Sequence, residues 1–331
     1  MAFKFKGGVH PDYRKSPDVP VTVIAPPQQV VIPMAQHIGA PCTPLVKKGD
    51  HVNMYQKIGE NPAPVSAPVH ASVSGTVVAV EPRPHPLGDM IMSVVIENDG
   101  LDTPELMEPL TEAQLRDPEA ILQRIREAGV VGMGGAMFPT AFKIRGGIGK
   151  VDKLVINGAE CEPYLNGDHL TMLNFPEQLM KGIELARIAQ GVDKVYYGIE
   201  KNKQDAIEIM QAAAAKAEGI RVVGLPVRYP QGGEKQLVYA LTRRQVPNGG
   251  LPLDVGVVVS NVGTVYAIDR AIREGRPLVD RVTTVGGLVH NPGNFFVRIG
   301  TTVEYLLKAC GGLQSHVKQF IYGGPMMGMS I

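Results

Sequence analysis

Residues 132–143 read GMGGAMFPTAFK and place three glycines within four positions, followed by an aromatic residue, a proline and a lysine. Glycine adopts positive φ without strain, so successive backbone N–H groups can point into one concavity that binds an anion. Pro139 suits the first turn of a helix, whose N-terminus adds partial positive charge, and Lys143 lies about one turn further on. The residue types fit a phosphate site and, equally, a plain turn with a surface lysine.

Two common phosphate-binding loops do not match this stretch. The dinucleotide fingerprint GxGxxG requires a glycine where Met137 stands, and it must follow a strand, whereas this loop follows a predicted helix. The pattern GxxxxGK[ST] is absent as well. The loop is therefore neither a dinucleotide fingerprint nor a Walker loop.

Three further polar bends follow predicted strands: NGAECEPY at 157–164, YPQGGEK at 229–235 and SNVGT at 260–264. Ligands of open α/β sheets bind beyond the carboxyl ends of the strands. Glu160 and Glu162 could accept hydrogen bonds from ribose or amide groups, and a catalytic carboxylate pair is a weaker alternative. Asp168 and His169 lack a metal-ligand spacing. Each bend alone is explained by helix capping, but all four in one domain indicate a nucleotide or flavin cleft.

The elements that must position these bends alternate between helix and strand in the middle of the chain. This alternation predicts a mostly parallel sheet covered on both faces. We predict strands at 153–157, 194–199, 220–227 and 254–260, and helices at 117–129, 176–190, 203–217, 234–241 and 265–274.

The two flanking regions differ from the middle. Residues 1–105 contain short β-prone runs broken by Gly, Pro and Asn, which predicts a small β sandwich or barrel. This region resembles a lipoyl or biotin carrier, but its central turn, SAPVHAS, contains His70 and no lysine, so we expect no covalent arm there. His70 is predicted to be a surface or packing residue rather than a ligand. Residues 276–331 suggest a β-grasp unit with a strand, strand, helix, strand order.

Composition excludes several classes of protein. The 331 residues are 44% hydrophobic and 20% charged, as in globular proteins, and the net charge of +1 shows no basic excess for nucleic acid. Cys42, Cys161 and Cys310 have no CxxC spacing, so neither a disulfide framework nor a four-thiolate iron–sulfur cluster is expected within these residues. No apolar run reaches the roughly 18 residues of a membrane span, and the N-terminus lacks the apolar core of a secretory signal.

Ten ordered motifs are spread over essentially the whole chain: GGVH, HIGAP, VSAPVHA, GMGGAMFPTAFK, NGAECEPYLNGD, YPQGGEKQL, VPNGG, SNVGTVYA, PGNFFVRIG and GGPMMG. Together they resemble RnfC, the C subunit of the Rnf electron-transport complex. The chain is also similar to a cobalamin reductase of propanediol-utilisation compartments and, more distantly, to the flavin-bearing subunit of respiratory complex I.

The resemblance implies an α/β fold: a barrel-sandwich hybrid domain at 1–105, a Rossmann-like FMN and NADH domain at 106–275 and an SLBB-like β-grasp domain at 276–331. It also implies non-covalent FMN, with NADH as substrate. Phe138 would stack on adenine, and Glu162 would bond to ribose or nicotinamide, with Glu234 beside them. The residues that would hold FMN are Gly132, Gly134, Gly135, Lys143, Asn157, Glu160, Gly233, Glu234, Ser260, Asn261 and Thr264.

The function implied is oxidation of NADH, with electrons passing through FMN to 4Fe–4S clusters and on toward ferredoxin, coupled to ion translocation. Hydride transfer is cofactor chemistry, so no general base is expected. The partners would be Rnf-type membrane and iron–sulfur subunits, with the chain peripheral on the cytoplasmic side of the cell membrane. The family's cluster-binding cysteines follow GGPMMG, beyond these residues, so we expect a truncated chain.

Three departures from the relatives' patterns limit how far this resemblance extends. Met137 replaces the usual glycine of the loop, which puts close ligand approach there in doubt. Ala159 and Lys235 replace acids of the complex I subunit, so details of that relative transfer poorly. Two alternatives remain open: a flavin-dependent NADH:cobalamin reductase, and a non-catalytic docking module in which the glycine loops are structural.

Overall fold

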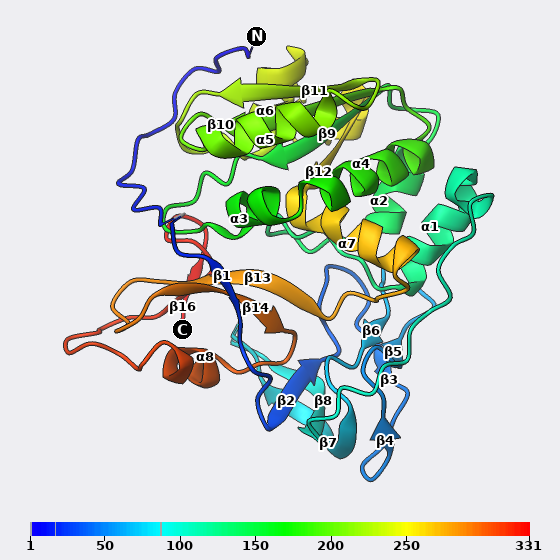
Figure 1. The fold of residues 1–331 in the computed structure, drawn as a ribbon, viewed down its shortest axis with the longest axis vertical. Helices are drawn as coiled ribbons and strands as arrows, with labels where there is room; N and C mark the ends of the chain where they lie inside the picture. The colour runs from blue at the N-terminus through cyan, green and yellow to red at the C-terminus, as the bar shows by residue number, and fades with distance from the viewer. Residues whose placement is uncertain (1, 17, 87) are drawn as a thin grey trace.

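The computed structural model describes residues 2–16, 18–86 and 88–331, which form three units along the chain. A β-rich unit is followed by an α/β unit and then by a smaller β unit with one helix, as Figure 1 shows. This order agrees with the predicted fold class.

The α/β unit is built on four parallel strands. In spatial order these are β11 (Ile220–Leu225), β10 (Lys194–Glu200), β9 (Lys153–Gly158) and β12 (Val257–Asn261). The chain moves outward from β9 through β10 to β11 and then returns to the other side of β9 to form β12. The strand order therefore reverses between β9 and β12, where open α/β sheets bind their ligands. Asn157 and Asn261 are register partners at this point.

Alternating strand residues supply two hydrophobic cores, one on each face of the sheet. In β9, Leu154 and Ile156 pack into one cluster and Val155 into the other. Helix α6 (Glu234–Thr242) covers the second face. The first cluster is formed with α1 (Pro118–Glu127), α2 (Thr140–Gly147), α3 (Gly167–Asn174), α4 (Pro176–Gln190), α5 (Gln204–Ala214) and α7 (Val262–Arg273).

Helices α4 and α7 approach closely on the first face. A Cβ on Gly182 of α4 would lie 1.9 Å from the carbonyl oxygen of Val265 in α7. Only glycine fits there, so α4 packs directly against the first turn of α7, which follows β12 without a break.

Most of the predicted elements of the middle region are present, with shifted ends. Residues 252–255 form a 3-10 turn rather than the start of β12, since Gly256 adopts the left-handed region at φ 70° and β12 begins after it. The prediction missed α3, which is short and directly precedes α4.

The β-rich unit consists of two sheets around an apolar core. One sheet contains β2 (Gln29–Pro33), β8 (Met90–Asn98), β7 (Gly75–Pro84) and β4 (His51–Val52); the other contains β3 (Thr43–Pro44), β5 (Lys57–Glu60) and β6 (Val69–His70). His70 is 3% exposed, and neither ring nitrogen has a hydrogen-bond partner among the described residues. Gly129 at the end of α1 lies against it, so His70 has the packing role that the sequence predicts.

The third unit pairs β14 (Gly293–Arg298) with β13 (Asp280–Val285) on one side and with β1 (Val21–Val23) on the other. Helix α8 (Val303–Ala309) and a hairpin of β15 (Ile321–Tyr322) and β16 (Met329–Ser330) complete it. The predicted first domain, 1–105, thus includes a strand that pairs in the third unit. The predicted domain boundaries stay a prediction.

Among the described residues, no helix has the length and apolar character that a membrane span requires.

Candidate functional site

The glycine loop lies against the first turn of α7. The Met133 N–H donates a hydrogen bond to Thr264 Oγ1 at 2.9 Å in a buried position. A Cβ on Gly134 would lie 3.5 Å from Asn261 Cβ. Asn261 is the N-cap of α7 and accepts a hydrogen bond from the Gly263 N–H. The loop therefore sits at the point where the strand order reverses, and so does Ser260, the half-buried residue before Asn261.

The bend at 229–235 is tied to the end of β9. Asn157 Nδ2 donates to the Gly232 carbonyl at 2.9 Å, and the Gly232 N–H donates to Cys161 Sγ at 3.2 Å. Gly233 is the N-cap of α6, and Glu234 is the first residue of that helix. A carboxylate in a first turn is stabilised by the helix dipole.

An ion pair joins the glycine loop's helix to this bend. Lys143 Nζ in α2 lies 2.6 Å from Glu234 Oε1 in α6, and the two side chains are 30% and 44% exposed. The four bends predicted from sequence thus form one connected cluster. An incoming phosphate would compete with the Glu234 carboxylate for Lys143.

The tip of the glycine loop is exposed and unusual in its backbone. Gly135 has φ 120°, and a Cβ there would meet nothing within 4 Å. Met137 has φ 45°, a left-handed conformation that glycine adopts with less strain. The Gly132 N–H donates to the Phe138 carbonyl at 2.8 Å, and the Phe138 ring meets Phe142 edge-on at 5.9 Å between centroids.

Glu160 turns inward and does not face the glycine loop. Its carboxylate accepts hydrogen bonds from the N–H groups of Asp168, at 2.7 Å, and His169, at 3.2 Å, at the start of α3. Lys15 Nζ lies 4.0 Å from it, and the Glu160 side chain is 6% exposed. Burial raises the pKa of Glu160 to about 7, and the Lys15 ammonium opposes that rise. The predicted contact of this side chain with FMN would require it to leave α3.

Glu162 contacts the third unit. Its Oε2 accepts a hydrogen bond from the Met326 N–H at 3.0 Å, and a Cβ on Gly324 would lie 2.1 Å from the same oxygen. The residue predicted to bind the nicotinamide nucleotide is therefore covered by residues 323–328, the GGPMMG motif.

Sequence reasoning missed several residues near the carboxyl ends of the parallel strands. Lys203 is 1% exposed and donates to the Ala159 carbonyl at 2.7 Å, with Glu200 at 3.6 Å. Lys15 holds the next part of the same bend. Neither lysine stands in a recognisable motif, so the sequence carries no signal for them. Asp168 accepts a hydrogen bond from Asn261 Nδ2 at 2.6 Å, and this contact ties α3 to the end of β12.

Some of the buried polar atoms that lack a hydrogen-bond partner lie on the four bends. Among the described residues, Thr140 Oγ1, Glu162 Oε1 and Gln231 Nε2 are buried and make no hydrogen bond. A buried polar group without a partner is costly, and a bound ligand is one means of supplying the missing hydrogen bond. One hydroxyl, one acceptor and one donor on three bends fit the hydroxyl, phosphate and amide groups of a nucleotide.

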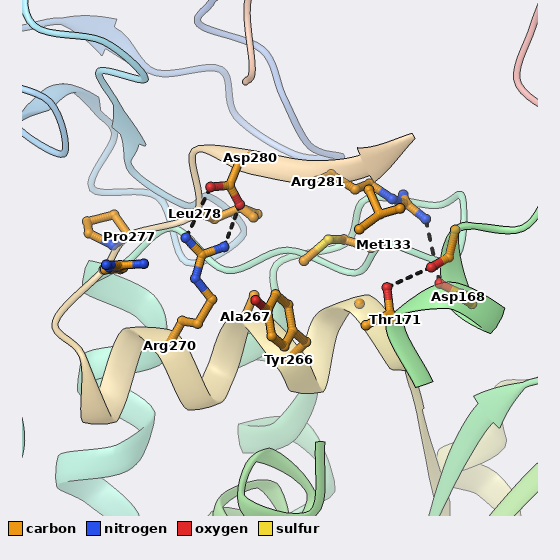
Figure 2. Close-up of a pocket in the computed structure, with 14 residues that line it drawn as sticks. Met133, Asp168, Thr171, Tyr266, Ala267, Arg270, Pro277, Leu278, Asp280 and Arg281 are labelled. Carbon is orange, nitrogen blue, oxygen red and sulfur yellow. Dashed lines mark hydrogen bonds and ion pairs between the residues drawn. The ribbon is translucent and has the colours of Figure 1, made fainter. Parts of the chain in front are cut away.

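A small cleft with an accessible volume of about 20 Å³ lies between α3, α7 and β13. Figure 2 shows Arg270 paired with Asp280 and Arg281 directed toward Asp168 along its walls. Met133 and Gly263 line this cleft, so it adjoins the glycine loop. None of the thirteen residues predicted for FMN or NADH lines it.

Comparison with known families agrees with this architecture. The profile described as the RnfC barrel sandwich hybrid domain matches residues 3–101, the Nuo51 FMN-binding domain matches 125–270 and the SLBB domain matches 282–330. An NAD+-reducing [NiFe]-hydrogenase in the H2-reduced state superimposes with a TM-score of 0.53 at 26% identity, over 60% of this chain and 40% of that chain. The class is thus a flavoprotein-type α/β domain between two small β units.

Curated relatives are more similar still. The C subunit of the Na(+)-translocating ferredoxin:NAD(+) oxidoreductase complex of Acetobacterium woodii is 48% identical over 98% of this chain and 75% of the relative. The proton-translocating counterpart of Clostridium ljungdahlii is 45% identical over 100% of this chain and 73% of the relative. The C subunit of the ion-translocating oxidoreductase complex of Klebsiella pneumoniae is 44% identical, over 99% and 44%. The chain belongs to the RnfC family, the C subunits of Rnf-type ion-translocating oxidoreductase complexes.

Proposed function

We propose that this chain binds FMN between the four bends and exchanges electrons between NADH and that flavin, as a subunit of an Rnf-type ion-translocating complex. The observation that carries the proposal is the convergence of the four bends where the strand order reverses, at Asn157 and Asn261. Family membership and the match to an FMN-binding domain support it.

The chain's own residues hold the ligands and need not transfer protons. Backbone N–H groups of Gly134 and Gly135, with the first turn of α7 and Lys143, supply positive charge for the phosphate. When bound, FMN accepts a hydride and releases electrons singly, so it couples NADH to iron–sulfur clusters. Phe138 stacks on adenine, and Glu162 accepts hydrogen bonds from the nicotinamide nucleotide.

The rest of the proposed cofactor set lies on the same four bends. Asn157 and Gly233 lie next to the start of α6, and Ser260, Asn261 and Thr264 lie at or next to the start of α7. Thr264 already holds the glycine loop in place. Gly132 shapes the loop's base through its bond to Phe138.

The names of these relatives give ferredoxin as the electron donor and NAD(+) as the electron acceptor. Hydride transfer at a flavin is reversible, so the same site serves NADH oxidation in an assay and NAD+ reduction in the complex. We propose the other subunits of such a complex as direct partners, ferredoxin as an indirect one, and a peripheral position on the cytoplasmic side of the membrane. The 4Fe–4S clusters are proposed to lie outside these residues.

The first test is identification of the cofactor released from the native protein by absorbance and mass spectrometry. We expect about one FMN per chain, and a loss of flavin in Lys143→Met that is not seen in Lys150→Met, an exposed lysine just beyond α2. A flavin-free native protein, with both variants unchanged, would instead support the docking-module alternative. Nothing in the comparisons favours that alternative or cobalamin reduction.

A further inference from the structure

The N-terminal arm, residues 2–16, runs along the α/β unit and crosses two of the four bends, as Figure 1 shows on the left side of that unit. Val9 exchanges two backbone hydrogen bonds with Tyr229, both 2.8 Å, in the bend that precedes α6. Further along, the Tyr164 N–H donates to the Tyr13 carbonyl at 2.7 Å, in the bend that follows β9. The arm therefore fixes both bends from one side.

Within the arm, Lys15 makes three hydrogen bonds to the bend that follows β9. Its side chain is 12% exposed, and its ammonium donates to the carbonyl oxygens of Glu160 at 2.8 Å, Glu162 at 2.7 Å and Leu165. These bonds use all three donors that an ammonium has. The Glu160 carboxylate, 4.0 Å away, completes its surroundings.

Residues 160–165 have a conformation that they are not expected to hold unaided. Glu160 and Tyr164 have φ values of 46° and 66°, in the left-handed region that side chains disfavour. Gathering three carbonyl oxygens around one point is unfavourable without a cation between them. Lys15 supplies that cation, and the loop between its contacts carries Glu162.

We propose that Lys15 is a positioning residue for NADH: it holds the backbone of the loop at 160–165 that carries Glu162, whose carboxylate binds the nicotinamide nucleotide in place of the Met326 N–H. This inference rests on the proposed function. The alternative is that Lys15 only anchors the arm and leaves the nucleotide site unaffected.

The test compares FMN-loaded Lys15→Met with Lys6→Met, which removes an exposed lysine of the same arm. For Lys15→Met we expect the FMN content to be kept and the KM for NADH to rise about tenfold or more with little change in kcat. Hydrogen exchange of the apo protein should quicken for amides 160–169. Lys6→Met should match the wild type in all four measurements.

A second pair of variants keeps the test valid if Lys15→Met folds poorly. Lys15→Arg retains the charge but cannot place three donors in the same way, so its KM should lie between those of wild type and Lys15→Met. Adding Glu162→Gln to Lys15→Arg should raise KM by less than the product of the single effects, because both act through one carboxylate.

Two kinetic results would overturn the inference. One is a KM within about twofold of wild type in Lys15→Arg and Lys15→Met, whatever the amide exchange shows. The other is a KM effect that multiplies fully with that of Glu162→Gln. If the wild-type holoprotein itself does not react with NADH, the proposed function is refuted. Independently of that, unchanged amide exchange at 160–169 in apo Lys15→Met would show that Lys15 does not hold the loop.

Discussion

The substitution Gly135→Ala tests whether the glycine loop's conformation matters to flavin binding. Gly135 has φ 120°, which side chains rarely adopt, but an added Cβ would meet nothing within 4 Å. The strain is therefore conformational and not steric. A residue held in such a region costs about 1–3 kcal/mol.

Because the loop tip is exposed, the strain should affect FMN binding and not the stability of the free protein. Residues 134–137 are exposed, so without ligand the variant loop relaxes and the midpoint of thermal unfolding changes little. Binding of FMN must restore the strained conformation. The cost of about 1–3 kcal/mol then raises the Kd for FMN by about 5- to 150-fold.

The assay is a titration of apo protein with FMN, followed by quenching of flavin fluorescence. Gly149→Ala is the matched control, because Gly149 is also exposed, has φ 73° and has open space at its Cβ, but it lies in the turn between α2 and β9. We expect a wild-type Kd for that control. If Gly135→Ala also binds FMN within about twofold of wild type, the loop does not hold the flavin as proposed.

Three further predictions follow from other contacts. Gly182→Ala should destabilise the protein by about 1–3 kcal/mol in urea unfolding, because its Cβ would meet the Val265 carbonyl at 1.9 Å; an unchanged unfolding midpoint would contradict the close helix contact. Gly324→Ala should push residues 323–328 off Glu162 and lower the KM for NADH at constant FMN content, whereas a raised KM would show that this contact assists binding. Burial lowers the pKa of His70 from 6.5 in the unfolded chain to about 3, so its contribution to the free energy of unfolding is complete above pH 6.5 and falls as the pH drops below that value. In urea unfolding, the wild type should lose about 2 kcal/mol at pH 5 relative to pH 7.5. The variant His70→Gln should not show this loss.

The alternation of elements and the convergence of the bends followed from local rules. Strands such as 153–157 and helices such as 176–190 have the apolar patterns of their structures, and the carboxyl ends of parallel strands necessarily share an edge. Sequence reasoning therefore brought Asn157, Asn261 and Gly134 to one place. Met137 was singled out because a glycine was expected there, and its φ of 45° is a conformation that glycine adopts with less strain.

What sequence reasoning missed depends on contacts between distant segments. Lys15 is 145 positions from the Glu160 carbonyl that it holds, and Met326 is 164 positions from Glu162. No local pattern records such pairings. Glu160 was expected to face the ligand because it follows a strand, but α3, which the sequence did not reveal, uses its carboxylate as a cap.

The most direct measurement is anaerobic addition of NADH to the FMN-loaded protein while the visible flavin absorption is recorded. Four bends that place FMN where NADH can reach it predict complete bleaching of the flavin by one equivalent of NADH, about two electrons per chain. Flavin that stays oxidised in the presence of excess NADH, although bound at one per chain, would contradict the proposed arrangement.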